Sequence, residues 1–351
     1  MVNSNYGEDI MGFLSKLFSK KPEEPEVKVT IKPQISIAPN SSDIPPYQGD
    51  YAKTVFLWAH DKASPIRHND DYPRYFLFEC GISNPASYHK KLIQEGYFIK
   101  ASKASSLNAL KVTELKEILT TIGQPTTGKK DALIERILST ADEISLNSFC
   151  KEELFVLSET GEDFLVQHNN YIQLHKHKNW GIDWQEFDAN YRPGFSFYDV
   201  VWGILNKRVI QDRRNFGRGE YLFMYQLLAE EGKRERAIEM LLRVLYIDLS
   251  GVLGMSCFDL YKSGMYSKKE LYEYFNVAIM IAPGIINPIS EFKDVYSDEI
   301  VDRLYEQKLP IQLCDKNLFL TLIHSILEGT YDEAAIENKL KSSYNKFIQM
   351  L

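Results

Sequence analysis

Two adjacent lysines, Lys129 and Lys130, stand where the segment "TTGKKDALIERIL" predicts the start of a helix. Acidic residues are usual there, because the positive end of the helix dipole disfavours an exposed cation by about 0.3–1 kcal/mol. Asp131 offsets part of that cost. The first N–H groups of a helix have no partner within it, so these amides and the two ammonium groups together suit a phosphate. We therefore expect an anion-binding helix start near Thr127 or Gly128.

The residues around the lysines predict a small helical hairpin. A first helix is expected in "VTELKEILTTIG", with Thr113 as its N-cap and Gly123 at its end. Apolar residues recur at helical spacing in this segment and in "DALIERIL". They are Leu115, Ile118, Leu119 and Ile122 in the first helix, and Leu133, Ile134, Ile137 and Leu138 in the second. Because the connection "QPTTG" is short, the two faces are expected to close into one very small core.

Residues 108–140 resemble the SAP motif, a short helix, an extended loop and a second helix. The resemblance rests on "LKVTELKEIL", "TTIGQPTTGKK" and "DALIERIL". The family occurs in chromatin and DNA-repair proteins and also in bacterial and phage proteins, and we expect a bacterial or phage protein here. The resemblance implies contacts with the backbone of duplex DNA, often A·T-rich, through Gly128, Lys129 and Lys130, supported by Thr127 and Arg136. Gln124 departs from the family, which usually has an apolar residue at this place.

The local charge of this hairpin limits what it can bind alone. Residues 107–140 carry five basic side chains (Lys111, Lys116, Lys129, Lys130, Arg136) against four acidic ones (Glu114, Glu117, Asp131, Glu135), a net charge of +1. Each phosphate that is neutralised contributes about −0.9 to the salt slope of duplex binding, so two or three contacts give weak, non-specific binding. Useful affinity therefore requires a second contact surface.

A second basic segment, "NKRVIQDRRNFGRGEY" at residues 206–221, is the candidate for that surface. Arginines in a glycine-containing loop beside aromatic residues can follow a phosphate backbone and stack on bases. The candidate residues are Lys207, Arg208, Arg213, Arg214 and Arg218. The alternative is a solvated loop and helix end whose arginines pair with nearby carboxylates.

Two other groups of residues have types that could bind a metal. His168, His175 and His177 include an HxH spacing in "YIQLHKH", which predicts a strand with two imidazoles on one face. Asp183, Glu186 and Asp188 lie in an aromatic-rich segment and could serve a metal-dependent nuclease. No cysteine or acidic partner lies at a recognised interval from the histidines, and solvated acidic residues are common. We therefore expect no metal and no cofactor.

The predicted fold class is mainly α with a minor β component, arranged in several modules. An N-terminal amphipathic segment and a proline-rich linker occupy residues 1–46. They are followed by a small helical module (47–106), the SAP-like hairpin (107–142), a mixed, aromatic-rich region (143–203) and a helical C-terminal domain (204–351). The four cysteines have no CxxC spacing, which favours buried thiols in a reducing, cytoplasmic location.

The whole-chain composition sets the range of functions. A net charge of −7 argues against a protein that coats nucleic acid with its entire surface. We expect a non-enzymatic protein that binds or tethers duplex DNA. The alternatives are a scaffold that binds a protein partner, or itself, through the C-terminal helices, and, third, a metal-dependent nuclease. Residues 10–21 form an apolar stripe flanked by lysines, which predicts either weak contact with a membrane surface or a partner, or a short helix packed on the body.

Overall fold

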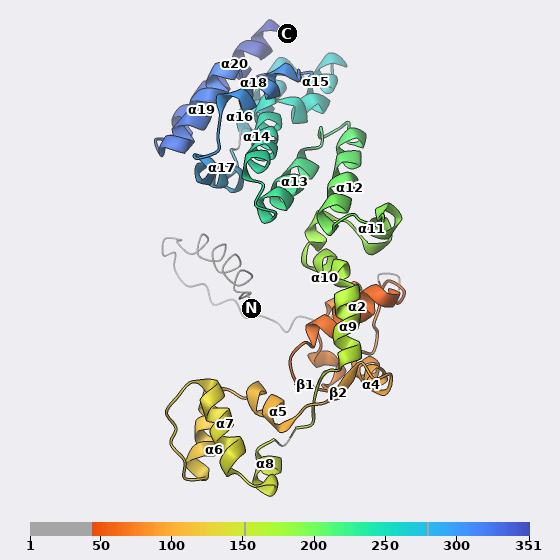
Figure 1. The fold of residues 1–351 in the computed structure, drawn as a ribbon. Helices are drawn as coiled ribbons and strands as arrows, with labels where there is room; N and C mark the ends of the chain where they lie inside the picture. Colours follow the sequence, from red (N-terminus) through yellow and green to blue (C-terminus); the bar gives the residue numbers. More distant parts are fainter. Residues whose placement is uncertain (1–43, 151, 279–280) are drawn as a thin grey trace, which may run out of the picture. The chain divides into compact units, whose positions relative to one another are not determined.

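The computed structural model describes residues 44–150, 152–278 and 281–351. Over these residues the chain is mainly α-helical with a small antiparallel sheet, which confirms the predicted fold class (Figure 1). The amphipathic segment at residues 10–21, and most of the predicted linker, lie outside the described residues. No single helix in the described ranges is long and apolar enough to span a bilayer. One bent pair, Arg234–Ser250 with Val252–Lys262, passes the same test jointly, by length and composition only.

The first described module contains three α-helices and a 3₁₀ turn. The sequence predicted a small helical module here, and the first of its helices buries Ala52, Val55, Phe56 and Leu57 fully. Asn84 caps the third by accepting from the N–H of Ser87, and Pro85 occupies its first turn. The elements are α2 (Gly49–Ala59), η2 (Asn69–Asp71), α3 (Tyr75–Phe78) and α4 (Pro85–Gln94).

A three-stranded antiparallel sheet joins distant parts of the sequence. Its strands are β1 (Ser64–Pro65), β2 (Phe98–Lys100) and β3 (Leu154–Leu157), in the order β1-β3-β2. β2 pairs with β3 in a register that sets Lys100 opposite Phe155. The N–H of Ala101 donates to the carbonyl of Leu154 at 2.8 Å, and Lys100 pairs with Glu153 at 2.8 Å. Residues 102–153 therefore leave and re-enter the sheet at one point, as an insertion in a β-hairpin.

The inserted residues form a four-helix module around its own hydrophobic cluster. The predicted hairpin supplies α6 and α7, and its core is confirmed, since Leu115, Leu119, Leu133 and Ile137 are fully buried. Leu107 of α5 joins this core, and Leu146 and Phe149 of α8 pack against it. The elements are α5 (Lys103–Ala109), α6 (Val112–Thr121), α7 (Lys130–Thr140) and α8 (Glu143–Phe149).

The chain after β3 is helical. The strand predicted in "YIQLHKH" is wrong, because residues 171–176 belong to a helix that buries Ile172, Leu174 and His175. A short apolar run fits both the two-residue period of a strand and the 3.6-residue period of a helix, so alternation alone did not distinguish a strand from a helix here. The elements are α9 (Glu159–Gln167), α10 (Asn169–Lys176), η3 (Lys178–Trp180), α11 (Trp184–Asn190) and α12 (Phe197–Gln211).

The C-terminal part is helical, as the sequence predicted, and several of its helices pack against α14. Residues of α14 such as Leu241, Leu242 and Leu245 are buried against α13, α17 and α18. Cys257 and Cys314 are buried free thiols, as is Cys80. The elements are α13 (Arg218–Glu230), α14 (Arg234–Ser250), η4 (Val252–Gly254), α15 (Met255–Lys262), α16 (Lys268–Ala278), α17 (Pro283–Ile289), η5 (Ser290–Phe292), α18 (Asp298–Glu306), α19 (Lys316–Glu328) and α20 (Glu333–Met350).

Candidate nucleic-acid interface

The start of α7 presents backbone amides without a side-chain cap. α7 begins at Lys130, later than the predicted start at Thr127 or Gly128. The delay has a local cause, since Gly128 has φ +129°, outside the helical region. Lys129 takes the N-cap position with extended backbone and makes no side-chain capping bond. The N–H groups of residues 130–132 therefore have no side-chain acceptor at this end of the helix.

The two lysines at this helix start have different surroundings. The ammonium group of Lys130 donates to the backbone carbonyl of Asn108, near the end of α5, at 2.6 Å. Lys129 is exposed and makes no ion pair within the described part of the chain. Thr127 and Gly128 are exposed beside it. Thr127, Gly128 and Lys129 thus form the accessible surface at the start of α7, and Lys130 joins α7 to α5.

Arg136 fixes the loop that leads to this surface. Its Nη1 group donates to the carbonyl of Pro125 at 2.5 Å and to that of Thr127 at 3.1 Å. Both acceptors belong to the connection between α6 and α7, and the Arg136 side chain is half-buried. The sequence pointed to Arg136 as a supporting DNA contact, whereas the structure gives it intramolecular acceptors.

The first helix of the hairpin begins differently from the prediction. Thr113 is not its N-cap, because α6 begins at Val112 and the carboxylate of Glu114 accepts from the N–H of Lys111 at 2.6 Å. At the other end, Gly123 has φ +71° and the N–H of Gln124 donates to the carbonyl of Leu119 at 2.8 Å. These bonds are those of a helix C-terminus closed by a left-handed glycine. Gln124 thus contributes its backbone to the hairpin, although its side chain departs from the family pattern.

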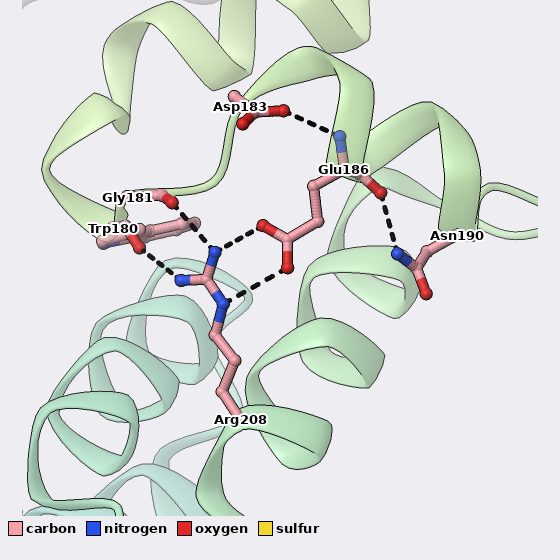
Figure 2. A network of polar contacts seen from close by, with 6 residues as sticks. All are labelled: Trp180, Gly181, Asp183, Glu186, Asn190 and Arg208. Atoms are coloured by element: carbon pink, nitrogen blue, oxygen red, sulfur yellow. Dashed lines mark hydrogen bonds and ion pairs between the residues drawn. The ribbon is translucent and has the colours of Figure 1, made fainter. Parts of the chain in front are cut away.

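Two arginines of the second candidate surface are held within the fold. Figure 2 shows that the guanidinium of Arg208, on α12, donates hydrogen bonds to both carboxylate oxygens of Glu186 on α11. The same group donates to the carbonyls of Trp180, at 3.2 Å, and Gly181, at 2.9 Å. Arg218, at the start of α13, forms a bidentate ion pair with Asp248 on α14. For these two residues the geometry matches the alternative in which arginines pair with carboxylates.

The other three basic residues of that segment are exposed. Lys207, Arg213 and Arg214 make no ion pair within the ranges that the structure describes. Asp212 shapes the loop that carries the two arginines, because its carboxylate accepts from the N–H groups of Arg214 at 3.2 Å and Asn215 at 3.0 Å. The accessible cations in this segment are thus three of the five candidate residues.

The histidines considered as metal ligands bind different neighbours. Nδ1 of His175 lies 2.6 Å from the Glu79 carboxylate, and Nδ1 of His168 lies 2.9 Å from the carbonyl of Phe164. His177 stacks on Trp180 with ring centroids 4.1 Å apart. Over the described residues, no three histidine, cysteine or acidic side chains lie together as a metal site would require.

The three acidic residues considered for a nuclease also have partners in the fold. Asp183 caps α11 by accepting from the N–H of Glu186 at 2.7 Å, as Figure 2 shows. Glu186 pairs with Arg208, and Asp188 accepts from the hydroxyl of Tyr171 at 2.7 Å. Each carboxylate therefore stabilises a helix start or a contact between elements.

Comparison with known families agrees with the geometry of the hairpin. Residues 106–140 match the SAP domain. This match includes α6, the loop held by Arg136, and α7, together with the last residues of α5. A SAP domain suggests DNA binding in general terms. No curated protein and no solved structure matches the chain.

Proposed function

We propose that this protein binds duplex DNA through the exposed start of α7 in its SAP domain, without catalysing a reaction. The observation that supports this most directly is the position of Lys129. Lys129 is exposed and makes no ion pair with any described residue, and it stands next to backbone N–H groups that no side chain in the described ranges caps. A phosphate oxygen can accept from those amides while the lysine and the helix dipole supply positive charge.

Two other basic residues of the hairpin, Lys130 and Arg136, hold this surface in shape. Lys130 bonds α7 to α5, and Arg136 bonds the loop to α7. A preformed loop loses little entropy when it meets the DNA backbone, which favours binding. A single free ammonium group gives a small salt slope, so the proposal includes Lys207, Arg213 and Arg214 as further backbone contacts.

The β-hairpin offers a clean test of the proposal. Since Ala101 stands opposite Leu154, residues 102–153 can be replaced by Asn-Gly, which favours a two-residue hairpin turn. The full chain is expected to bind duplex DNA at low ionic strength with a measurable salt slope. The excised chain should keep its helical circular dichroism apart from the lost helices, and should bind duplex DNA more weakly and with a shallower salt slope than the full chain.

Two outcomes would contradict the proposal. One is a full-length protein that shows no salt-dependent binding to duplex DNA, and the other is an excised chain that binds as tightly as the parent. Should the excised chain fail to fold, Lys129→Glu in the full chain gives the same information, because it reverses the charge at an exposed position. Incubation of the parent with duplex DNA and Mg²⁺ is expected to leave the DNA uncut.

A further inference from the structure

A surface cavity of about 640 Å³ is lined by residues outside the SAP domain. Its walls come from α2, α3, α10, η3 and α11 and the turns beside them. Pockets of roughly 300–1,000 Å³ with apolar walls and a few convergent polar groups are typical of small-ligand sites. The apolar walls here are Pro45, Pro46, Phe78, Leu174, Ile182 and Trp184.

The carboxylate of Glu79 is one of the charged groups that line this cavity. Its Oε1 atom accepts from the hydroxyl of Tyr51 at 2.5 Å and lies 2.6 Å from Nδ1 of His175. Its Oε2 atom accepts no hydrogen bond from the described residues, and its nearest cation is Nζ of Lys178 at 3.7 Å. One oxygen therefore fixes the orientation of the carboxylate, while the other has its hydrogen-bonding capacity unused.

The Glu79 side chain is charged at neutral pH. Burial by itself would raise the pKa of Glu79, but the hydrogen bonds from His175 and Tyr51 outweigh burial and lower that pKa. A carboxylate that is mostly buried, charged and only half hydrogen-bonded favours a cationic partner.

The net charge of the residues that line the cavity also favours a cation. Glu79 and Asp183 give two negative charges, and Lys178 gives one positive charge, so these lining groups have a net charge of −1. The Lys178 side chain is 64% exposed and too far from Oε2 for a hydrogen bond, which makes the pair weak and displaceable. The indole N–H of Trp184 is occupied by Gln48 at 2.8 Å, which holds this aromatic wall in place.

We propose that this cavity binds an organic cation, an alkylammonium or alkylguanidinium group, whose charged head pairs with Oε2 of Glu79. The apolar stem would lie along the wall formed by Leu174, Ile182 and Trp184, and aromatic rings nearby also favour a cation. A free amine and the side chain of lysine or arginine in a peptide share this chemistry. This proposal does not depend on the proposed DNA binding, because the cavity is lined by other residues.

The test is a calorimetric titration of the full chain at low ionic strength, without DNA. The probes are agmatine and n-butylammonium as free cations, a capped peptide with one arginine, and n-butanol as the neutral counterpart. Agmatine and n-butylammonium are expected to bind and n-butanol to show no binding. Binding of the capped peptide as tight as that of agmatine would assign the site to protein side chains, and binding of the free cations alone would assign it to small amines.

Three variants make the test specific. Glu79→Gln is expected to weaken cation binding by about tenfold or more, because a bond to a charged group is lost. Lys178→Ala should tighten it by roughly two- to fivefold, since it removes a competing cation at an exposed position. Glu235→Gln makes the same change of net charge as Glu79→Gln at an exposed position of α14, and should leave binding unchanged.

Several results would overturn the proposal. They are binding of n-butanol equal to that of n-butylammonium, failure of both free cations to bind, and undiminished binding by a folded Glu79→Gln variant. If Glu79→Gln does not fold, Lys178→Ala decides, because unchanged or weaker cation binding in that variant contradicts the proposed competition.

Discussion

Lys130 and Asn108 join two helices of the SAP domain through one hydrogen bond, from the Lys130 ammonium group to the Asn108 carbonyl at 2.6 Å. Its neighbour Lys129 has no such partner among the described residues and is exposed. Two adjacent residues of one type therefore have separate roles, one in the fold and one at the surface that we propose for DNA. This separation makes them a matched pair for mutagenesis.

Lys129→Ala is expected to weaken DNA binding without affecting the fold. The variant should make the salt slope shallower by about 0.9, the contribution of one phosphate contact. Its free energy of unfolding should stay within about 0.5 kcal/mol of the parent, since the side chain is exposed. Fluorescence anisotropy over a series of salt concentrations, together with urea unfolding, measures both quantities.

Lys130→Ala serves as the counterpart and should behave in the opposite way. It removes the bond to Asn108, so the free energy of unfolding of the inserted module should fall by about 1 kcal/mol. The salt slope should change less than in Lys129→Ala. A larger change of slope in Lys130→Ala than in Lys129→Ala would show that Lys130 leaves Asn108 to contact phosphate.

Arg136→Gln is expected to lower DNA affinity through the loop and not through a lost phosphate contact. Without the guanidinium, the carbonyls of Pro125 and Thr127 lose their donor, and the loop becomes free to adopt other conformations. The affinity should fall about three- to tenfold with an unchanged salt slope, whereas a direct phosphate contact would make the slope shallower by about 0.9. Lys116→Gln removes the same charge at an exposed position of α6 and controls for the overall field.

The apolar residues of the SAP domain could be predicted from sequence because their spacing encodes the core. Leu115, Leu119, Leu133 and Ile137 recur at helical intervals and are fully buried. α5 was missed because Leu107 is its one large apolar residue, too little for a periodic pattern. The insertion between β2 and β3 was also missed, since strand pairing across residues 101–153 is non-local and leaves no local pattern.

The partners of the basic residues could not be predicted for a related reason. Arg208 meets Glu186 across 22 residues, and Arg218 meets Asp248 across 30. Residue type shows that an arginine can bind either a phosphate or a carboxylate, and the fold determines which of the two is within reach. Sequence alone therefore grouped five basic residues that the structure separates into two paired and three exposed.

Arg208→Ala and the double variant Arg213→Ala with Arg214→Ala should separate these two classes. Arg208→Ala leaves Glu186 and two carbonyls without their donor, so the free energy of unfolding should fall by about 2 kcal/mol. The double variant should keep the stability of the parent within about 0.5 kcal/mol, because both side chains are exposed. If the loop contacts DNA, the salt slope of duplex binding by the double variant should be shallower than that of the parent by about 1.8. An unchanged slope would remove residues 213 and 214 from the proposed interface.

Loss of the Arg218–Asp248 pair should lower the free energy of unfolding more than loss of the Arg208–Glu186 pair. Burial raises the pKa of Asp248 even though the guanidinium of Arg218 acts to lower it. Arg218→Ala would leave this carboxyl group buried without a cation, so the free energy of unfolding should fall by about 3 kcal/mol at neutral pH. A further Asp248→Asn exchange should recover part of that loss, because it removes the unpaired charge. Thermal unfolding of the single and double variants measures this recovery, and its absence would mean that the pair contributes little.

The buried imidazole of His89 should make the stability of the protein depend on pH. This imidazole is fully buried, with Nδ1 3.0 Å from the hydroxyl of Tyr72 and Nε2 without a partner among the described residues. Burial, with the nearby His60, lowers the pKa of His89 to about 4. In the unfolded chain its pKa returns to about 6.5, so between pH 6.5 and 4 the unfolded chain binds a proton that the folded chain does not.

The stability contribution of neutral His89 is therefore complete above about pH 6.5 and is lost as the pH falls toward 4. The loss should reach about 3 kcal/mol at most. Urea unfolding of the parent and of His89→Gln at several pH values isolates this contribution, because other titrating groups are common to both proteins. The free energy of unfolding of the parent should fall more steeply with acid than that of the variant. Parallel pH profiles would show that protonation of His89 is not linked to unfolding.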